Sequence, residues 1–298
     1  MRMDTILDAI GNTPLIRLGR MSSGRVFAKA EFLNPGGSIK DRVARHIIEA
    51  AEQGGQLHPG MTIIEATSGN TGIGLTLVGV RRGYSVTCVM PENVSEERKK
   101  IIQAFGGEIV STPAEESLPG CLRVMREITQ AGPDRYFVVN QFSNPLNPEV
   151  HYRFTGREIW QQMEERVDVF VAGVGSGGTL QGVGQFLKEQ SPGVKLIAVE
   201  PKNSAALLGR EPGLHQIQGI GDGFVPDVLD VSLVDMVFTV TDDEAIETTR
   251  RLSQEEGMLV GTSSGANVFA ALHVDNGRNR VVTVLPDRAE RYFSTALL

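Results

Sequence analysis

A lysine stands beside a glycine pair and a serine where a helix is predicted to begin. The stretch NPGGSIKDR spans residues 34–42, and residues 44–55 have the pattern of an amphipathic helix. Ser38 fits the N-cap, and Asp41 three residues later completes a capping-box pattern. Lys40 then lies in the first turn, where the positive end of the helix dipole disfavours a cation. This placement indicates either an amine of lowered pKa, suited to attack a carbonyl, or a solvated side chain on a capped helix.

A second candidate for chemistry is the loop TSGNTG, residues 67–72, between a predicted strand at 61–66 and a predicted helix at 71–83. Small and hydroxyl side chains in a row expose several backbone N–H groups around one point at a helix N-terminus. Such a nest binds a carboxylate or a phosphate, although ordinary strand-to-helix turns favour the same residue types. The loop therefore predicts either an anion site or a plain turn.

A third loop, GVGSGGT at residues 173–179, follows a predicted buried strand at 167–172. It contains the pattern G-x-G-x-x-G at Gly173, Gly175 and Gly178. Glu200 closes the next predicted strand, where a dinucleotide fold would place its ribose-binding acid, so an NAD-binding oxidoreductase is one hypothesis. The density of glycine and hydroxyl residues equally suits a lone phosphate, with Ser176 and Thr179 as donors.

Together the three loops predict a site with three components: an activated lysine, an anionic small molecule and a phosphate. A phosphate-bearing aldehyde cofactor joined to Lys40, with an amino-acid carboxylate in the 67–72 loop, satisfies all three. Ligands of open α/β folds bind at the carboxyl ends of the strands, where such loops stand.

The elements that must position these loops alternate along the chain. Further strands are predicted at residues 26–32, 84–90, 108–112, 136–140 and 195–201, and further helices at 95–107, 118–132 and 178–190. A Pro- and Asn-rich break at 143–149 precedes a long predicted helix and marks a candidate domain boundary. Strands separated by helices of this length form βαβ units, so the predicted fold class is α/β with parallel sheets.

The composition excludes several classes of protein. The chain has 298 residues, a hydrophobic content of 41% and a formal net charge of -7, which argues against a nucleic-acid or membrane-surface binder. No apolar run reaches membrane-spanning length, and the N-terminus lacks the pattern of a signal peptide. The two cysteines, Cys88 and Cys121, form no C-x-x-C pair and the five histidines are scattered, so no metal site is expected. These features fit a cytoplasmic enzyme.

Several motifs, in the same order along the chain, resemble those of the cysteine synthase (O-acetylserine sulfhydrylase) family. Members of this family are β-substituting, fold-type II pyridoxal-phosphate enzymes. The resemblance is carried by NPGGSIKDR, EATSGNTGIGL, VMPENVSEERKKIIQAFGGEIV, NQFSNPLNP, GVGSGGTLQG and GTSSGANV, and runs from GNTPLIRL to ERYFSTALL. It implies a two-domain, tryptophan synthase β-like fold, with a twisted, mostly parallel sheet flanked by helices in each domain. Residues 1–12 and 36–145 would form a smaller mobile domain with the substrate-carboxylate loop, and residues 13–35 and 146–298 a larger domain with the phosphate loop.

The resemblance also implies a role for each matching residue, with pyridoxal 5'-phosphate as the cofactor. Lys40 would form the Schiff base and act as catalytic base, Asn70 would bond the ring's phenolic oxygen, and Ser263 would meet the ring nitrogen. The phosphate would be held by Gly175, Ser176, Gly177, Gly178 and Thr179. The substrate would be bound by Thr67, Ser68, Gly69, Thr71 and Gln141 at its carboxylate and by Gly219 near its amine.

The implied activity is β-replacement on O-acetyl-L-serine with sulfide, through an aminoacrylate, to give L-cysteine and acetate. Donor and acceptor stay open: O-phosphoserine would need a cation near the leaving group, with Arg210 as a candidate, and thiosulfate, a thiocarboxylate carrier or homocysteine could replace sulfide. The Gly36–Gly37 pair resembles relatives of the B-type enzymes and cystathionine β-synthases, whereas QGIGDGFVPD resembles the A-type. A homodimer and a serine acetyltransferase partner are further expectations of the resemblance.

Overall fold

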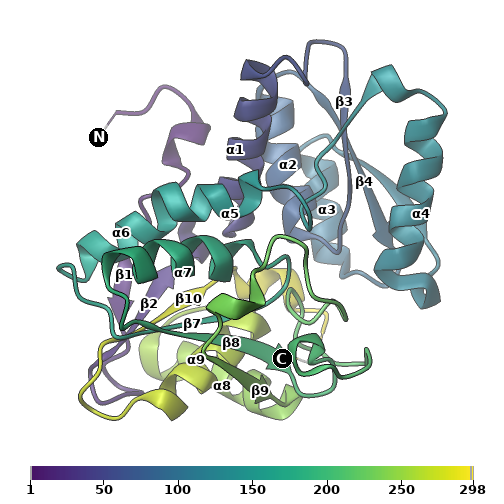
Figure 1. Ribbon diagram of the computed structural model, residues 1–298. Coiled ribbons are helices and arrows are strands. Elements are labelled where there is room, and N and C mark those ends of the chain that lie inside the picture. Colours follow the sequence, from purple (N-terminus) through teal and green to yellow (C-terminus); the bar gives the residue numbers. More distant parts are fainter. Residues whose placement is uncertain (1, 296, 298) are drawn as a thin grey trace.

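The computed structural model describes residues 2–295 and 297, so positions 1, 296 and 298 of the predicted domains lie outside it. Figure 1 shows two sheets, each flanked by helices. One has four strands in the order β5-β4-β3-β6, and the other has six in the order β1-β2-β10-β7-β8-β9. Within the described chain, neighbouring strands are parallel except for the antiparallel pair β1 and β2. The predicted fold class is confirmed.

The four-stranded sheet contains strands predicted in the first half of the chain. They are β3 (Thr62–Ala66), β4 (Ser85–Pro91), β5 (Glu108–Thr112) and β6 (Tyr136–Val138). The accompanying helices are α1 (Lys40–Gln53), α2 (Asn70–Arg81), α3 (Glu96–Ala104) and α4 (Ser117–Gln130). β3 and β4 are buried along almost their whole length, because parallel strands with helices on both faces have no solvated side.

The six-stranded sheet combines strands from both ends of the chain. They are β1 (Leu15–Arg17), β2 (Val26–Ala30), β7 (Val169–Gly173), β8 (Lys195–Pro201), β9 (Met236–Val240) and β10 (Val281–Leu285). Its helices include α7 (Gly178–Gln190), α8 (Asp242–Glu256) and α9 (Thr262–Val274). The buried strand β10 lies between β2 and β7, so the C-terminal part of the chain joins the N-terminal hairpin to the rest of the sheet.

The long helix predicted after the Pro- and Asn-rich break is divided into three consecutive segments. These are α5 (Leu146–Val150), a π-helical turn at His151–Thr155 and α6 (Gly156–Gln162). Single π-helical turns inside helices occur frequently at functional sites. Here the π-helical turn places His151 in the interior of the molecule, fully buried.

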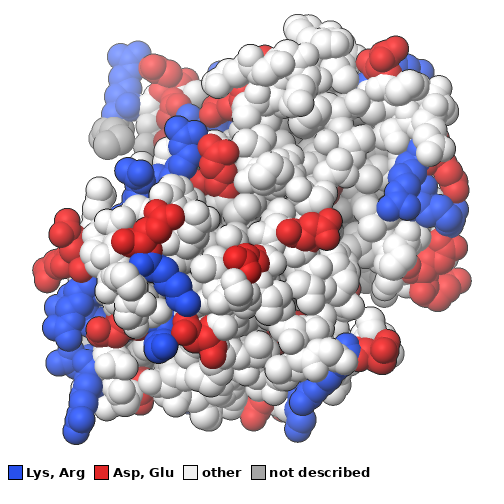
Figure 2. Space-filling model, viewed as in Figure 1, with Lys and Arg blue, Asp and Glu red and all other residues white. Residues whose placement is uncertain are grey.

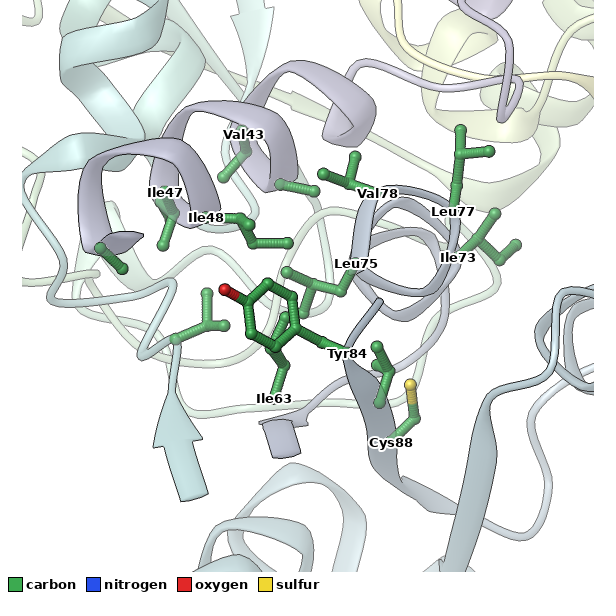
Figure 3. Close-up of a cluster of buried hydrophobic side chains, with 14 of the residues drawn as sticks. Val43, Ile47, Ile48, Ile63, Ile73, Leu75, Leu77, Val78, Tyr84 and Cys88 are labelled. Carbon is green, nitrogen blue, oxygen red and sulfur yellow. The ribbon is translucent and has the colours of Figure 1, made fainter. Parts of the chain in front are cut away.

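One apolar cluster holds α1 and α2 together on the four-stranded sheet. Figure 3 shows Ile48 of α1 and Leu75 of α2 beside the ring of Tyr84, with Ile63 of β3 beneath. The two helices approach closely because α2 has a glycine at the contact: a Cβ at Gly74 would lie 2.9 Å from a backbone oxygen at the start of α1. The packing therefore sets the first turn of α1 against the helix that follows the 67–72 loop.

The surface carries charges of both signs. On the face seen in Figure 2, acidic and basic side chains are interspersed and do not gather into a patch of one sign. Among residues 2–295 and 297, no helix combines the length and apolar character needed to cross a bilayer. Both cysteines are buried, and burial raises the pKa of Cys88 to about 12, so this thiol is a structural part of the core.

Gly182 is predicted to be required where α7 packs against α5. A Cβ there would lie 2.1 Å from the backbone oxygen of Pro148, which cannot rotate away. Gly182→Ala should therefore lower the free energy of unfolding by about 1–3 kcal/mol. Gly193→Ala is the matched control: an added Cβ there has nothing within 4 Å, and its stability should stay within about 0.5 kcal/mol of the parent. Urea denaturation measures both, and equal stabilities would contradict the packing argument.

Candidate active site

Two adjoining cavities are lined by loops from both sheets. The first cavity lies beside the 67–72 loop and includes Gln141 and Ser263. The second lies beside the 173–179 loop and includes Asn267. The residues common to both are Ile39, Lys40, Ser176, Gly219 and Pro286. Lys40 thus stands where the two cavities meet.

The Lys40 side chain is directed into the protein and not into bulk solvent, so the simple reading of a solvated lysine is wrong. Its Nζ donates to Ser176 Oγ at 3.1 Å, across the two cavities. Burial lowers the pKa of this amine, while the carboxylates of Asp222 and Asp287 act in the opposite direction. A buried amine of lowered pKa is the form in which lysine serves as nucleophile or base.

The start of α1 differs from the predicted capping box. Ser38 Oγ does accept from Lys40 N, at 3.3 Å. Asp41, however, accepts from the backbone N–H of Gly36 at 2.6 Å and does not reach back to that of Ser38. Burial raises the pKa of Asp41 to about 7. The carboxylate therefore braces the glycine pair, where a Cβ on Gly36 would lie 2.5 Å from Asp41 Oδ1.

The 67–72 loop presents backbone N–H groups to the first cavity. Gly69 has a φ of +145°, a conformation that side chains disfavour, and its N–H donates to Thr67 Oγ1 at 3.0 Å. α2 begins at Asn70, so the N–H groups of its first turn have no partner within the helix. The exposed side chain of Ser68 lies beside them. This geometry suits an anion, as the loop composition predicted.

Gln141 completes the first cavity from the end of β6. Its Oε1 accepts from Thr71 Oγ1 at 2.7 Å, which leaves its amide N–H groups for a ligand. Behind it, the buried carboxylate of Glu65 accepts from the backbone N–H groups of Asn140 at 2.8 Å and Gln141 at 3.2 Å. Burial raises the pKa of Glu65 to about 7.

The 173–179 loop is packed too closely for larger residues. A Cβ at Gly175 would lie 2.4 Å from Gly219 O, and one at Gly178 would lie 2.1 Å from Asn147 Oδ1. Gly177 adopts a left-handed conformation as the N-cap of α7. Ser176 Oγ accepts from Asn147 Nδ2 at 3.1 Å as well as from Lys40, so its own hydrogen remains for another acceptor.

A buried histidine supports the last residue of this loop. His151 Nδ1 lies 3.0 Å from Thr155 Oγ1, and its Nε2 lies 3.4 Å from Thr179 Oγ1. Burial, together with the positive charge of Lys40 and Arg42, holds the pKa of His151 well below its usual range. A neutral imidazole can therefore orient the Thr179 hydroxyl without adding charge to the second cavity.

Asn70 is held by residues near the C-terminus that sequence reasoning did not identify. Its Nδ2 donates to Asp287 Oδ2 at 2.5 Å, and its Oδ1 accepts from Arg291 at 2.6 Å. Tyr292 also donates to Asp287, and Arg291 donates to Gly36 O. The second hydrogen of Asn70 Nδ2 remains available to a ligand. No local pattern links segments so far apart in sequence.

Arg98 of α3 was likewise missed, although it lines the first cavity and is almost fully buried. It donates to Ser68 O at 2.7 Å and to Gln218 Oε1, and its guanidinium lies 4.6 Å from the centroid of the Tyr292 ring. Gly69 makes room for it, since a Cβ there would lie 2.2 Å from Arg98 Cδ. One signal was present: Arg98 is one helical turn from the buried Ile102.

The structure brings most of the predicted site residues to these cavities. Those that line them are Lys40, Thr67, Ser68, Asn70, Thr71, Gln141, Gly175, Ser176, Gly177, Thr179, Gly219 and Ser263. Gly69 and Gly178 lie within the same loops and permit their close packing. Arg210 lines neither cavity and donates instead to Lys202 O at 2.8 Å.

The chain is similar over nearly its whole length to known enzymes. Residues 6–287 match the family model of pyridoxal-phosphate dependent enzymes. The chain belongs to this family. A cysteine synthase from Staphylococcus aureus is 45% identical over 302 residues, covering 99% of this chain and 97% of that protein. The predicted relationship to cysteine synthases and the pyridoxal-phosphate cofactor are thereby confirmed.

Solved structures agree with this family assignment. A cysteine synthase from Entamoeba histolytica has a TM-score of 0.94 and 39% identity, covering 100% of this chain and 91% of that one. An O-acetylserine dependent cystathionine beta-synthase from Helicobacter pylori has a TM-score of 0.93 and 39% identity, covering 100% of this chain and 99% of that one. Both share the fold of this chain along its whole length.

The residues around the cavities fit pyridoxal phosphate. The second cavity offers the first turn of α7 and the free hydroxyl hydrogen of Ser176 to a phosphate, and Lys40 stands at its junction with the first cavity. The NAD-binding hypothesis is wrong. Glu200 is buried and lines neither cavity, and both its carboxylate oxygens accept from Leu207 N at 3.2 Å.

Glu65 should make the stability of the protein depend on pH. Its pKa is about 7 in the folded chain and near the ordinary glutamate value of 4.5 when unfolded, so ionisation opposes folding. The stability that the protonated Glu65 allows is complete at a pH below its unfolded pKa, and it is lost as pH rises through its folded pKa. From pH 5.5 to pH 8 the free energy of unfolding should therefore fall by about 2 kcal/mol more in the parent than in Glu65→Gln. Urea denaturation across that range measures it, and parallel profiles would contradict the assignment.

Arg98 is predicted to support amino-acid binding and not cofactor binding. Arg98→Gln should raise the KM or Kd of an amino-acid substrate about ten-fold or more, because a charged hydrogen bond to the 67–72 loop is lost. The visible absorption of bound cofactor should be retained. Lys100→Gln, an exposed position on the same helix, is the control and should leave both quantities unchanged. A loss of cofactor with unaltered substrate affinity would contradict this role.

Proposed function

We propose that this protein is a cysteine synthase, which replaces the acetoxy group of O-acetyl-L-serine with sulfide to give L-cysteine and acetate. The observation that carries the proposal is the partly buried Lys40 amine, placed between two loops whose composition and N–H groups suit an anion and a phosphate. The 45% identity to a cysteine synthase over almost the full length supports the same activity.

In this proposal each loop holds one part of the reacting assembly. Lys40 would hold the cofactor aldehyde, and Asn70 and Ser263 would contact its ring. Its phosphate would be held by Gly175, Ser176, Gly177, Gly178 and Thr179. The substrate carboxylate would be received by Thr67, Ser68, Gly69, Thr71 and Gln141, with Gly219 near the amine. The free N–H groups and hydroxyls of both loops support these assignments.

Lys40 is the proposed general base. Bound pyridoxal phosphate supplies an electron sink for negative charge at the substrate Cα. The substrate amine would first displace Lys40 from the cofactor aldehyde, which would free its Nζ as a base. Lys40 Nζ would then remove the Cα proton, the Cβ–O bond would break and acetate would leave with the bonding electrons. Sulfide then forms the new Cβ–S bond and the proton returns to Cα, so atoms and charge balance overall. The lowered pKa of the Lys40 amine supports this use of a lysine near neutral pH.

The alternative donor, O-phosphoserine, lacks support from Arg210, which lies outside both cavities. Homocysteine remains a second candidate acceptor, because a structural relative from Helicobacter pylori is named as an O-acetylserine dependent cystathionine beta-synthase. The reactions with sulfide and with homocysteine use the same donor, O-acetylserine, and the same lysine. They differ only in the nucleophile that enters after acetate has left.

The division into a smaller mobile domain, residues 1–12 and 36–145, and a larger domain, residues 13–35 and 146–298, is part of the proposal. Arg98 supports coupled movement of the two, because it joins the 67–72 loop of the smaller domain to Gln218 of the larger one. Closure on binding a carboxylate would exclude water from the reacting centre. The buried, free thiols of Cys88 and Cys121 are in keeping with a cytoplasmic location.

A homodimer and an association with serine acetyltransferase are also proposed, on family resemblance. The loop that receives a substrate carboxylate would equally receive the C-terminal carboxylate of a partner peptide. Analytical ultracentrifugation of the purified protein, alone and with the acetyltransferase of the same source, measures both associations.

Lys40→Ala should abolish the visible absorption of the covalently bound cofactor. It should also lower kcat by at least about 100-fold, the range that a positioned general base contributes. Lys195→Ala, at an exposed lysine remote from both cavities, is the control and should keep both. The decisive panel compares sulfide, thiosulfate and homocysteine as acceptors with O-acetylserine as donor. Absence of cysteine formation by the cofactor-loaded parent would refute the proposed function.

A further inference from the structure

Three charged side chains line the first cavity: Lys40, Arg98 and Asp222. The first two have the partners described above. Asp222 makes no hydrogen bond and no ion pair with any residue in the described part of the chain. It does not line the second cavity, so it belongs to the half of the site that holds the substrate and not to the phosphate half.

The backbone that carries Asp222 is firmly held. The preceding Gly221 has a φ of +76° and donates its N–H to Val174 O at 2.9 Å. Its carbonyl accepts from Ser204 Oγ at 3.0 Å and lies 3.0 Å from His215 Nε2. Because the chain is anchored immediately before Asp222, its carboxylate is presented to the cavity by a fixed scaffold.

The charges around Asp222 come from several elements. The side chain of Asp222 is exposed at the edge of the cavity. Partial desolvation there raises its pKa, while Lys40 of α1 and His215 of the same loop act to lower it. Arg98 of α3 faces the same cavity, and Asp287 acts on Lys40 from the other side. Of the charges that act on Lys40, Asp222 has the largest effect.

The remaining substrate atoms can be located by elimination, an argument that rests on the proposed function. The substrate carboxylate occupies the 67–72 loop, above Arg98, and the Cα lies within reach of Lys40. The lining residues without another assigned role are Ile39, Leu118, Phe142, Asp222, Pro286 and Tyr292. Asp222 is the charged member of this set, so its charge decides which β-substituents and nucleophiles are admitted.

We propose that Asp222 selects the β-substituent and the incoming nucleophile by charge. It admits neutral and cationic groups, such as an acetyl ester or an aminothiol, and disfavours anionic ones, such as a phosphate ester or thiosulfate. A carboxylate at the exposed edge of the cavity repels an anion and attracts a cation without changing the shape of the cavity. Asp222 is therefore a specificity-determining residue of the first cavity.

The test uses two amino acids of similar size and opposite side-chain charge, S-(2-aminoethyl)-L-cysteine and S-carboxymethyl-L-cysteine. Their dissociation constants for the holoenzyme are measured by calorimetry, for the parent and for Asp222→Asn. The parent should favour the aminoethyl ligand, and the substitution should shift the ratio of the two constants by about ten-fold or more toward the carboxymethyl ligand. An unchanged ratio overturns the proposal.

Two further variants separate charge from general damage. Asp222→Glu retains the charge and should retain the parent preference. Asp227→Asn removes an exposed carboxylate of the same segment that lines neither cavity, and it should also behave as the parent. If Asp227→Asn shifts the ratio as far as Asp222→Asn, the effect belongs to net charge and the proposal fails.

Turnover distinguishes this inference from the proposed function. In Asp222→Asn the kcat/KM for O-phosphoserine relative to O-acetylserine should rise about ten-fold or more. If the parent forms no cysteine yet the binding ratio shifts, the proposed function fails and the charge selection stands. If the parent is active and neither ratio shifts, the charge selection alone is refuted.

Discussion

The buried ion pairs of Arg42 hold the start of α1, and every other part of the site depends on that position. Its guanidinium lies 2.7 Å from Glu31 and 2.7 Å from Glu158, which also lies 2.7 Å from Lys29. Charges removed from water are costly unless they are paired, so breaking one member would leave the others unsatisfied. The network ties α1 to the β2 side of the six-stranded sheet, while its apolar face packs on the four-stranded sheet.

With α1 held from both sides, Lys40 meets the loops of both sheets at once. The two sides of the site around Lys40 differ in charge. The 173–179 loop provides close-packed backbone and the hydroxyl of Ser176, and the buried His151 behind it stays neutral. The other wall is charged, with Arg98 beneath the substrate loop and Asp222 facing it. A pocket of uniformly low charge could bind the cofactor. Charges of opposite sign at two places in the wall are needed to orient an amino acid, with its carboxylate at one end and its side chain at the other.

Local sequence patterns predicted the strands from β2 to β8 and the three glycine-bearing loops, because burial and turn chemistry leave signals within a few residues. They failed where tertiary contacts decide. Asp41 matched a capping box but bonds to Gly36, and nothing near Asn70 indicates its partners. No elements were predicted beyond residue 201. Two local signals were nevertheless present there: the capping box at Thr241, which begins α8, and the short apolar run that forms β10. Arg98 was predicted only as part of the helix at 95–107, with no role in the site.

Several of the contacts that escaped prediction join residues about two hundred positions apart. Asn70 and Asp287 are separated by 217 residues, and Ser95 on α3 donates to the carbonyl of Arg291 across 196. Asp287 and Arg291 lie shortly after β10, which is placed between β2 and β7, so these bonds link the substrate loop and α3 to the six-stranded sheet. Long-range contacts form late because loop-closure entropy must be offset first. We therefore expect assembly of the substrate loop to be coupled to completion of the opposite sheet, so that binding competence requires both sheets to be folded.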